Sequence, residues 1–219
     1  MARAERIERV TLPLQIAERL RTDILAGTYP GGAQLPEMEL AITFGVSRGP
    51  LREALQRLVQ EGLLRSEPHR GVFVTEVGEE DLKDLFFVRE TLETAALRKI
   101  FEAGTQNKVS RDLIRIAERM DRAMKAGDKI SGGDLDFEFH RVLVDAAQSK
   151  RLSRTYASVQ TETRLCLHRL MGGYRSSRDL AAEHFRLAEL IETADLPDTL
   201  KELKNHLGDP ARHLKNTPT

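Results

Sequence analysis

The chain has 219 residues, 40% of them hydrophobic, which is enough for one larger domain or for two modest domains. Its 34 lysines and arginines balance 34 aspartates and glutamates, so overall charge gives no support for a nucleic-acid partner and any such contact must be local. No apolar run approaches the roughly 18 residues of a membrane span, the charged start MARAERIERV lacks the apolar stretch of a secretory signal, and one cysteine, Cys166, excludes a disulfide framework. We therefore expect a cytoplasmic protein that contacts no membrane.

The first expected helix spans residues 12–26, because apolar residues recur every four positions and Gly27 follows its end. A turn rich in proline and glycine then leads to a second, short helix that begins at Pro36.

The stretch FGVSRGPLREAL, residues 44–55, has the pattern of a tight turn followed by another helix. Gly45 supplies the backbone freedom of the turn, Ser47 is a good N-cap, and apolar residues then recur at helical spacing. Arginines at the start of such a helix suit guanine edges and phosphates, so the pattern predicts a helix-turn-helix DNA reader. Spacing alone leaves open the alternative that these arginines are solvated charge. The candidate DNA-contacting residues on the outer face are Arg48, Gly49, Arg52 and Gln56.

Two short strands are expected at residues 63–66 and 71–74, around a polar turn that contains Pro68 and Gly71. A helix-turn-helix followed by a hairpin is a winged helix, and Arg70 at the wing tip is placed to reach a phosphate or the minor groove. The alternative for Arg70 is a solvated turn residue.

Residues 75–80 form a short polar link, and we expect a DNA-binding domain at 1–76 and a second domain at 77–219. From Asp81 onward the periodicity is helical, which predicts an all-α antiparallel bundle and a mainly α protein with an N-terminal winged helix-turn-helix. The expected helices are 79–103, 110–126, 133–147, 150–171, 177–194 and 197–207, with breaks at Gly104, Gly127, Gly132–Gly133, Gly172–Gly173 and Pro197 and a frayed tail.

Within this second domain, Asp136 and His140 are four residues apart, so both side chains lie on one face of one helix. Two metal ligands can share that spacing. Either residue taken singly is as well explained by hydrogen bonding or exposure.

The stretch from GTYPGGAQLPEMELA through SRGPLREALQRLVQEGLLRSEPHRGVFV resembles the DNA-binding domain of GntR-family bacterial transcription regulators, over essentially all of residues 10–75. The second domain resembles the helical effector domain, called FCD, of the FadR-like branch. The motifs VRETLE, DFEFH, EH and NHL, at 88–93, 136–140, 183–184 and 205–207, follow the order of that branch. The expected number of six helices in this domain resembles that of the VanR-like subgroup of this branch.

This resemblance implies a homodimer whose two winged helices read a palindromic double-stranded operator. It implies that Arg48 and Arg52 are the recognition-helix arginines and that Gly71 is the wing glycine. It also implies that His184 and His206 complete a metal site with Asp136 and His140. An aspartate and three histidines suit a divalent transition metal ion, and zinc, nickel, manganese, iron or copper all remain open.

A coordination position left open on the metal would accept a small carboxylate effector, and Arg89 in VRETLE is a candidate partner for that carboxylate. The alternative for Arg89 is an ion pair with Glu93, four residues later on the same helix.

We therefore expect a ligand-responsive transcription regulator that is not an enzyme and has no catalytic residues. One alternative is a metal-dependent enzyme with an N-terminal interaction module, although no general base, nucleophile elbow or phosphate loop accompanies the ligands. Another alternative is a metal that only holds helices together.

Overall fold

The structure, a computed structural model, describes residues 11–171 and 180–208; for Lys129 and residues 168–171 it describes the backbone alone. The chain divides into two compact units, Met1–Glu76 and Val77–Thr219. The expected break at Gly172–Gly173, the start of the helix expected at 177 and most of the expected frayed tail lie outside the described residues.

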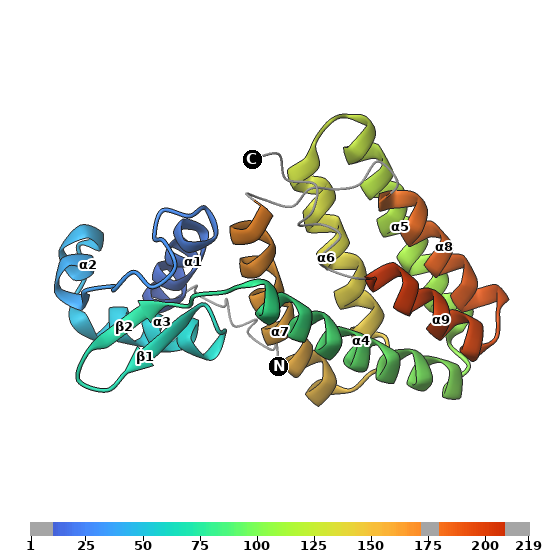
Figure 1. The fold of residues 1–219 in the computed structure, drawn as a ribbon, viewed down its shortest axis with the longest axis horizontal. Coiled ribbons are helices and arrows are strands. Elements are labelled where there is room, and N and C mark those ends of the chain that lie inside the picture. Colours follow the sequence, from blue (N-terminus) through green and yellow to red (C-terminus); the bar gives the residue numbers. More distant parts are fainter. Residues whose placement is uncertain (1–10, 172–179, 209–219) are drawn as a thin grey trace, which may run out of the picture. The chain divides into compact units, whose positions relative to one another are not determined.

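The described part of the first unit holds three helices and a hairpin (Figure 1). In chain order they are α1 (Leu12–Leu25), α2 (Glu37–Phe44), α3 (Arg48–Gln60), β1 (Leu64–Glu67) and β2 (Gly71–Val74). The two strands pair antiparallel in a register that runs from Leu64 opposite Val74 to Glu67 opposite Gly71. This is the winged helix-turn-helix expected from the sequence.

The turn between α2 and α3 depends on the conformation of Gly45. Its φ of 64° lies in the left-handed region, and an added Cβ would meet nothing within 4 Å, so glycine is required for its backbone and not for lack of space. Ser47 occupies the N-cap position of α3, but its hydroxyl makes no capping hydrogen bond. Pro36, expected as the first helical residue, is the N-cap of α2.

The core of this unit lies between α1 and α3, whose apolar stripes face each other. Because α3 turns this stripe inward, its other face, which carries the arginines, is left to solvent. The buried side chains are Ile16, Ala17, Leu20 and Ile24 of α1 and Leu51, Ala54, Leu55 and Leu58 of α3.

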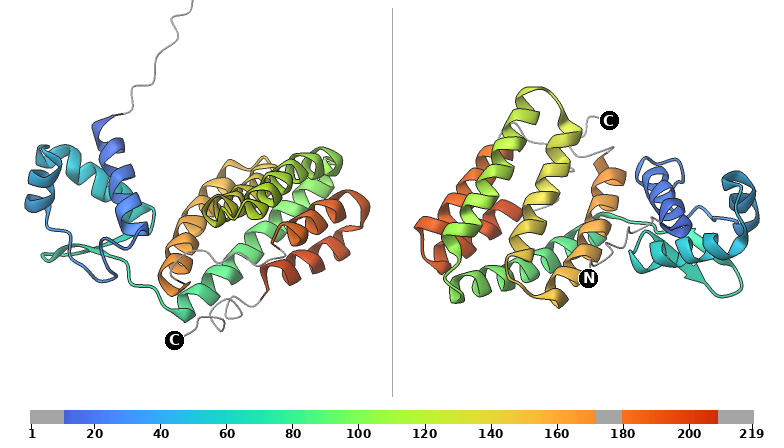
Figure 2. Two further views of the ribbon diagram at one scale, coloured as in Figure 1. Left: turned by 90° about the horizontal axis from the view of Figure 1, so that it is seen from above. Right: turned by 180° about the vertical axis from the view of Figure 1, so that it is seen from behind.

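The described part of the second unit is a bundle of six helices. They are α4 (Glu79–Glu102), α5 (Gln106–Lys125), α6 (Lys129–Asp145), α7 (Lys150–Met171), α8 (Leu180–Thr193) and α9 (Leu196–Leu207). Figure 2 shows this bundle from two further sides: α5 packs along α8 and α6, α6 also packs on α7, and α4 packs on α7 and α9. Among the described residues, no helix is long and apolar enough to cross a membrane.

Two helix starts in the bundle differ from expectation. The Gly132–Gly133 pair was expected to separate two helices, but α6 begins earlier in the sequence. The Asp128 carboxylate accepts a hydrogen bond from the Ser131 N–H at 3.0 Å and caps the helix there. Gly132 is instead a close-packing position, because a Cβ there would come within 2.6 Å of Met124 Sδ. Helix α5 begins four residues before the expected position 110, since its first turn carries few of the apolar residues on which the periodicity rests.

Candidate metal centre and nucleic-acid interface

Three helices of the second unit bring the four candidate metal ligands together. Asp136 and His140 lie on α6, His184 on α8 and His206 on α9. One ligand atom from each residue lies within 4.8 Å of the others. The first three side chains are buried and His206 is partly buried.

Hydrogen bonds fix the tautomers of two of these histidines. His140 Nδ1 lies 2.7 Å from the Glu93 carboxylate, and His184 Nδ1 lies 2.8 Å from the Leu180 carbonyl oxygen. The Leu180 carbonyl can only accept, and Glu93 accepts as a carboxylate, so both Nδ1 atoms carry a proton and donate. In a neutral imidazole the Nε2 atom then presents a lone pair.

The Nε2 atoms of His140 and His184 both lie close to other candidate ligand atoms. His184 Nε2 lies 2.9 Å from Asp136 Oδ1 yet has no hydrogen-bond partner of acceptable geometry, and His140 Nε2 lies 3.1 Å from His206 Nε2. Atoms that present lone pairs to one another repel unless a proton or a cation lies between them. The donor set of one carboxylate and three imidazoles therefore fits a divalent transition metal ion.

The ionisation states suit the same ligand set. Burial alone would raise the pKa of Asp136, but the contact with His184 and the electrostatic interactions with His140 and Arg89 outweigh it and hold the pKa well below its ordinary value. Burial, followed by the electrostatic interactions with His184 and His140, lowers the pKa of His206 well below its ordinary value. A charged carboxylate and a neutral imidazole are the forms that bind metal ions.

A second layer of side chains, which the sequence analysis missed, surrounds His140. Glu93 on α4 is fully buried; besides meeting His140 it accepts a hydrogen bond from the Tyr156 hydroxyl at 2.7 Å. Burial would raise the pKa of Glu93, but the hydrogen bond and electrostatic interaction with His140 and the charge of Arg89 outweigh it, so the pKa lies below its ordinary value and the carboxyl is ionised.

Arg89 belongs to the same buried network. Its Nε lies 3.4 Å from Glu93 Oε1, which is the ion pair that the sequence analysis left open as the alternative for this residue. Its guanidinium carbon also lies 5.0 Å from the centre of the Phe86 ring.

The predicted DNA-contacting residues of the first unit are all exposed. Arg48, Gly49, Arg52 and Gln56 lie on the outer face of α3, and Arg70 and Gly71 at the tip of the wing. Gly71 has a φ of 102°, a conformation that favours glycine at this tight turn.

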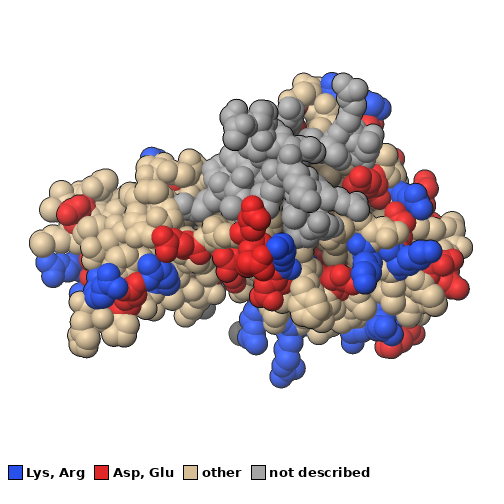
Figure 3. Space-filling model, in the orientation of Figure 1, with Lys and Arg blue, Asp and Glu red and all other residues tan. Residues whose placement is uncertain are grey.

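Each of the three predicted DNA-contacting arginines contacts an acidic or apolar neighbour. Arg52 Nε lies 2.7 Å from Glu37 Oε2, Arg48 Nη2 lies 3.6 Å from Met38 Sδ, and Arg70 pairs with Glu67. Figure 3 shows basic side chains next to acidic ones over the visible face, in keeping with the zero net charge. The arginine face is therefore local and not part of a basic domain.

The fold defines a winged-helix protein with a helical C-terminal unit that holds a buried cluster of candidate metal ligands. A model of the family described as "Bacterial regulatory proteins, gntR family" matches residues 12–74, and a model described as "FCD domain" matches residues 84–209. The chain belongs to the GntR family of bacterial transcription regulators and carries an FCD effector domain.

Relatives extend over nearly the whole chain. A protein of Paenarthrobacter nicotinovorans named "Probable D-xylose utilization operon transcriptional repressor" is 30% identical and spans 94% of this chain and 89% of its own. A gluconate operon transcriptional repressor of Bacillus licheniformis is 27% identical, over 93% of this chain and 85% of its own. A solved structure from Rhodococcus sp. RHA1, described as a transcriptional regulator of GntR type, is 26% identical with a TM-score of 0.75 and covers 94% of this chain and 99% of its own.

Proposed function

We propose that this GntR-family regulator is a ligand-responsive switch in which a metal ion and a small carboxylic acid, both bound in the second unit, alter operator binding by the first. The observation that carries the proposal is the convergence of Asp136, His140, His184 and His206 in a chain whose other unit is a winged helix.

On the DNA side, the exposed face of α3 enters the major groove of a palindromic operator. Arg48 and Arg52 contact base edges or phosphates, while Gly49 and Gln56 lie against the duplex. The wing tip, with Arg70 and Gly71, contacts the backbone or the minor groove. Two copies of the chain form a homodimer, so that the two-fold symmetry of the operator matches that of the protein.

On the effector side, the four side chains hold a divalent transition metal ion, which would supply a Lewis-acidic coordination position for a carboxylate oxygen. Partly buried His206 lies on the more accessible side of the cluster. Arg89, whose guanidinium carries five N–H donors and whose Nε lies 3.4 Å from Glu93 Oε1, pairs with the effector carboxylate in this proposal.

The relatives favour a regulator over an enzyme, because those reported above carry the names of transcription regulators. The names of two relatives refer to D-xylose and gluconate operons. Gluconate carries the carboxylate that this site would recognise, so it is the first acid to test, beside citrate.

A gel-shift assay on the DNA upstream of the operon that encodes the protein tests the proposal. We expect the zinc-loaded protein to retard this DNA sequence-specifically. Adding gluconate or citrate should change the protein concentration at which half of the DNA is retarded, which is the midpoint. Asp136→Asn is the matched variant, because it keeps the side-chain shape and removes the anionic ligand; it should bind the same DNA without responding to the acids. Retardation of unrelated DNA with the same midpoint would refute the DNA-reading role.

A further inference from the structure

The outer face of α4 carries a stripe of side chains whose spacing is symmetric about its middle. The stripe consists of Asp84, Phe87, Thr91, Ala95 and Arg98, which are exposed except for the half-buried Ala95. Steps of three or four residues place them on one face of the helix, and the steps are the same in both directions from Thr91. A single exposed apolar residue is ordinary, but Phe87, which is 67% exposed, lies here within an ordered stripe.

Charge changes sign along the same face. The first turn of α4 carries acidic residues at 79–81, and Asp84 follows about one turn later. Arg98 and Lys99 lie near the other end of the helix. Among the described residues, neither Asp84 nor Arg98 has an ion-pair partner, so both charges are available to another molecule.

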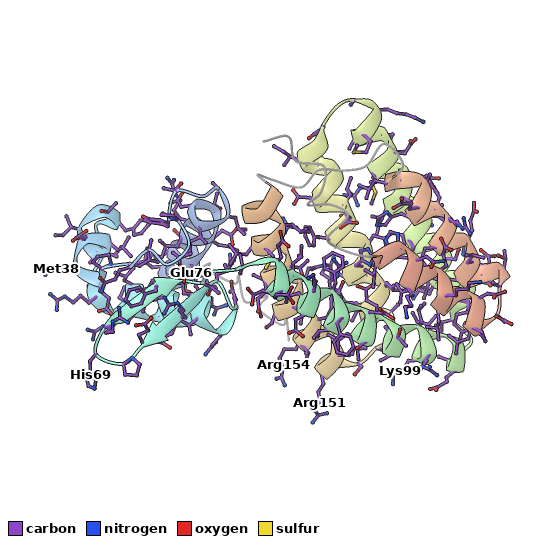
Figure 4. All side chains as sticks on the ribbon, viewed as in Figure 1. Met38, His69, Glu76, Lys99, Arg151 and Arg154 are labelled. Atoms are coloured by element: carbon purple, nitrogen blue, oxygen red, sulfur yellow. The ribbon has the colours of Figure 1, made fainter. Side chains whose placement is uncertain are left out.

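Helix α7 extends the basic end of this face. The second half of α4 packs on the first half of α7, and Figure 4 shows Lys99 of α4 projecting on the same side of the bundle as Arg151 and Arg154 of α7. Residues 146–161 contain no acidic side chain that could neutralise these two arginines locally. A molecule that covers the face therefore needs negative charge at this end and positive charge at the other.

A second copy of the same face meets both needs if the two α4 helices run antiparallel. In a two-fold interface, a contact between two different residues occurs twice, once in each direction. With Thr91 on the axis, Asp84 faces Arg98 of the other copy, and Phe87 faces the small Ala95, which leaves room for the ring. A parallel pair would instead place like charges opposite each other, so charge selects the antiparallel direction.

We propose that this face of α4 is the surface by which the chain pairs with a second copy of itself, antiparallel and with the two-fold axis at Thr91. The inference rests on the homodimer of the proposed function and adds the surface, the direction and the register. Phe87 is the apolar anchor of the interface, and Asp84 and Arg98 fix its direction.

Cysteine cross-linking tests the position of the axis. Thr91→Cys places the two introduced thiols next to each other, so mild oxidation of the full chain should convert most of it into a disulfide-linked dimer. Wild type should not cross-link, because its one cysteine, Cys166, is buried. Arg115→Cys is the matched control, because it places a thiol at an exposed position on α5; it should cross-link far less.

Charge reversal tests the direction and the register. Asp84→Lys or Arg98→Asp alone puts like charges together twice in each dimer and should raise the dimer Kd, measured by sedimentation equilibrium, about 10-fold. The double variant restores opposite charges and should return Kd close to the wild-type value. Arg115→Asp changes the net charge as Arg98→Asp does and should leave Kd unchanged.

Truncation of the anchor tests the apolar part of the interface. Phe87→Ala should raise the dimer Kd at least about 100-fold, because it removes an aromatic side chain from the contact in both copies. Since Phe87 and both charged residues are exposed, the circular dichroism spectra of these variants should match that of wild type.

Three results would overturn the inference and leave the homodimer in place. They are an unchanged Kd in Phe87→Ala, a double charge variant as weak as the single ones, or no more cross-linking of Thr91→Cys than of the control. A wild-type chain that sediments as a monomer at every concentration would overturn the homodimer of the proposed function and, with it, the inference.

Discussion

Glu93 offers the sharpest structural test of the metal centre, because it touches His140 without being one of the four candidate ligands. Glu93→Gln keeps the size of the side chain but removes its negative charge from a fully buried position. An amide oxygen can still accept from His140 Nδ1, but more weakly than a carboxylate. Arg89 loses its buried counter-charge.

The contacts set the expected magnitudes. Removing one partner of a buried ion pair lowers the free energy of unfolding by roughly 3–5 kcal/mol. Because the 3.4 Å distance between Arg89 Nε and Glu93 Oε1 is long, we expect metal-free Glu93→Gln to lose an amount near the lower end of this range. A carboxylate that orients a metal-binding histidine typically contributes about 10- to 100-fold in metal affinity. Because Glu93 lies 2.7 Å from His140 Nδ1, we expect its replacement to weaken zinc binding by such a factor.

Urea unfolding of the metal-free protein measures the first effect, and zinc competition with a chromophoric chelator measures the second. Tyr156→Phe is the matched control: it removes one hydrogen bond to Glu93 and keeps both charges. We expect it to lose only about 1 kcal/mol of unfolding free energy and to keep near wild-type zinc affinity. Equal zinc affinity for wild type and Glu93→Gln would show that Glu93 does not position a ligand.

Four further predictions concern the DNA-binding face, the metal site and the buried cysteine. Arg52→Ala should weaken binding to a duplex selected from a random library with the full chain by roughly 1–3 kcal/mol without changing the circular dichroism spectrum, and unchanged binding would mean that α3 is oriented otherwise. His184→Ala should lower the zinc content found by elemental analysis, and full zinc retention would remove His184 from the site. Chelation of the zinc-loaded protein should lower its Tm by roughly 5–10 °C at zinc concentrations about 100 times Kd; no shift would argue against a folded-state metal site. Burial raises the pKa of Cys166 to about 12, so iodoacetamide at pH 8 should alkylate the native thiol at least about 100-fold more slowly than the urea-unfolded one, and equal rates would contradict its burial.

The architecture could be predicted from the sequence wherever local signals were strong. The apolar stripe of α3 predicted which face turns inward, and therefore which face carries the arginines to the surface. The pair of Asp136 and His140 followed from helical spacing. The site roles of these residues remain predictions, although the structure brings all four candidate ligands within 4.8 Å.

Other contacts could not be predicted, because they join distant segments. Tyr156 reaches Glu93 across 63 positions of the chain, and no periodicity reports that α4 and α7 pack together. Glu37 pairs with Arg52 across the turn of the helix-turn-helix. The sequence contains both residues, but whether the Glu37 carboxylate points toward Arg52 depends on the angle between α2 and α3. The sequence analysis interpreted Gly132 and Gly133 as a break because glycine disfavours helix interiors. In the structure both lie within α6, because the Asp128 cap starts the helix before them, and Gly132 packs closely against Met124.

The central claim is that occupancy of the cluster by metal and acid alters DNA binding. It is tested most directly by the Kd of the full chain for a duplex that this chain selects from a random library. Three states are compared by fluorescence anisotropy: metal-free, zinc-loaded, and zinc-loaded with gluconate or citrate. We predict that Kd differs by at least about fivefold between two of these states, and that the difference disappears in Asp136→Asn. The same Kd in every state, with zinc shown to be bound, would contradict the account.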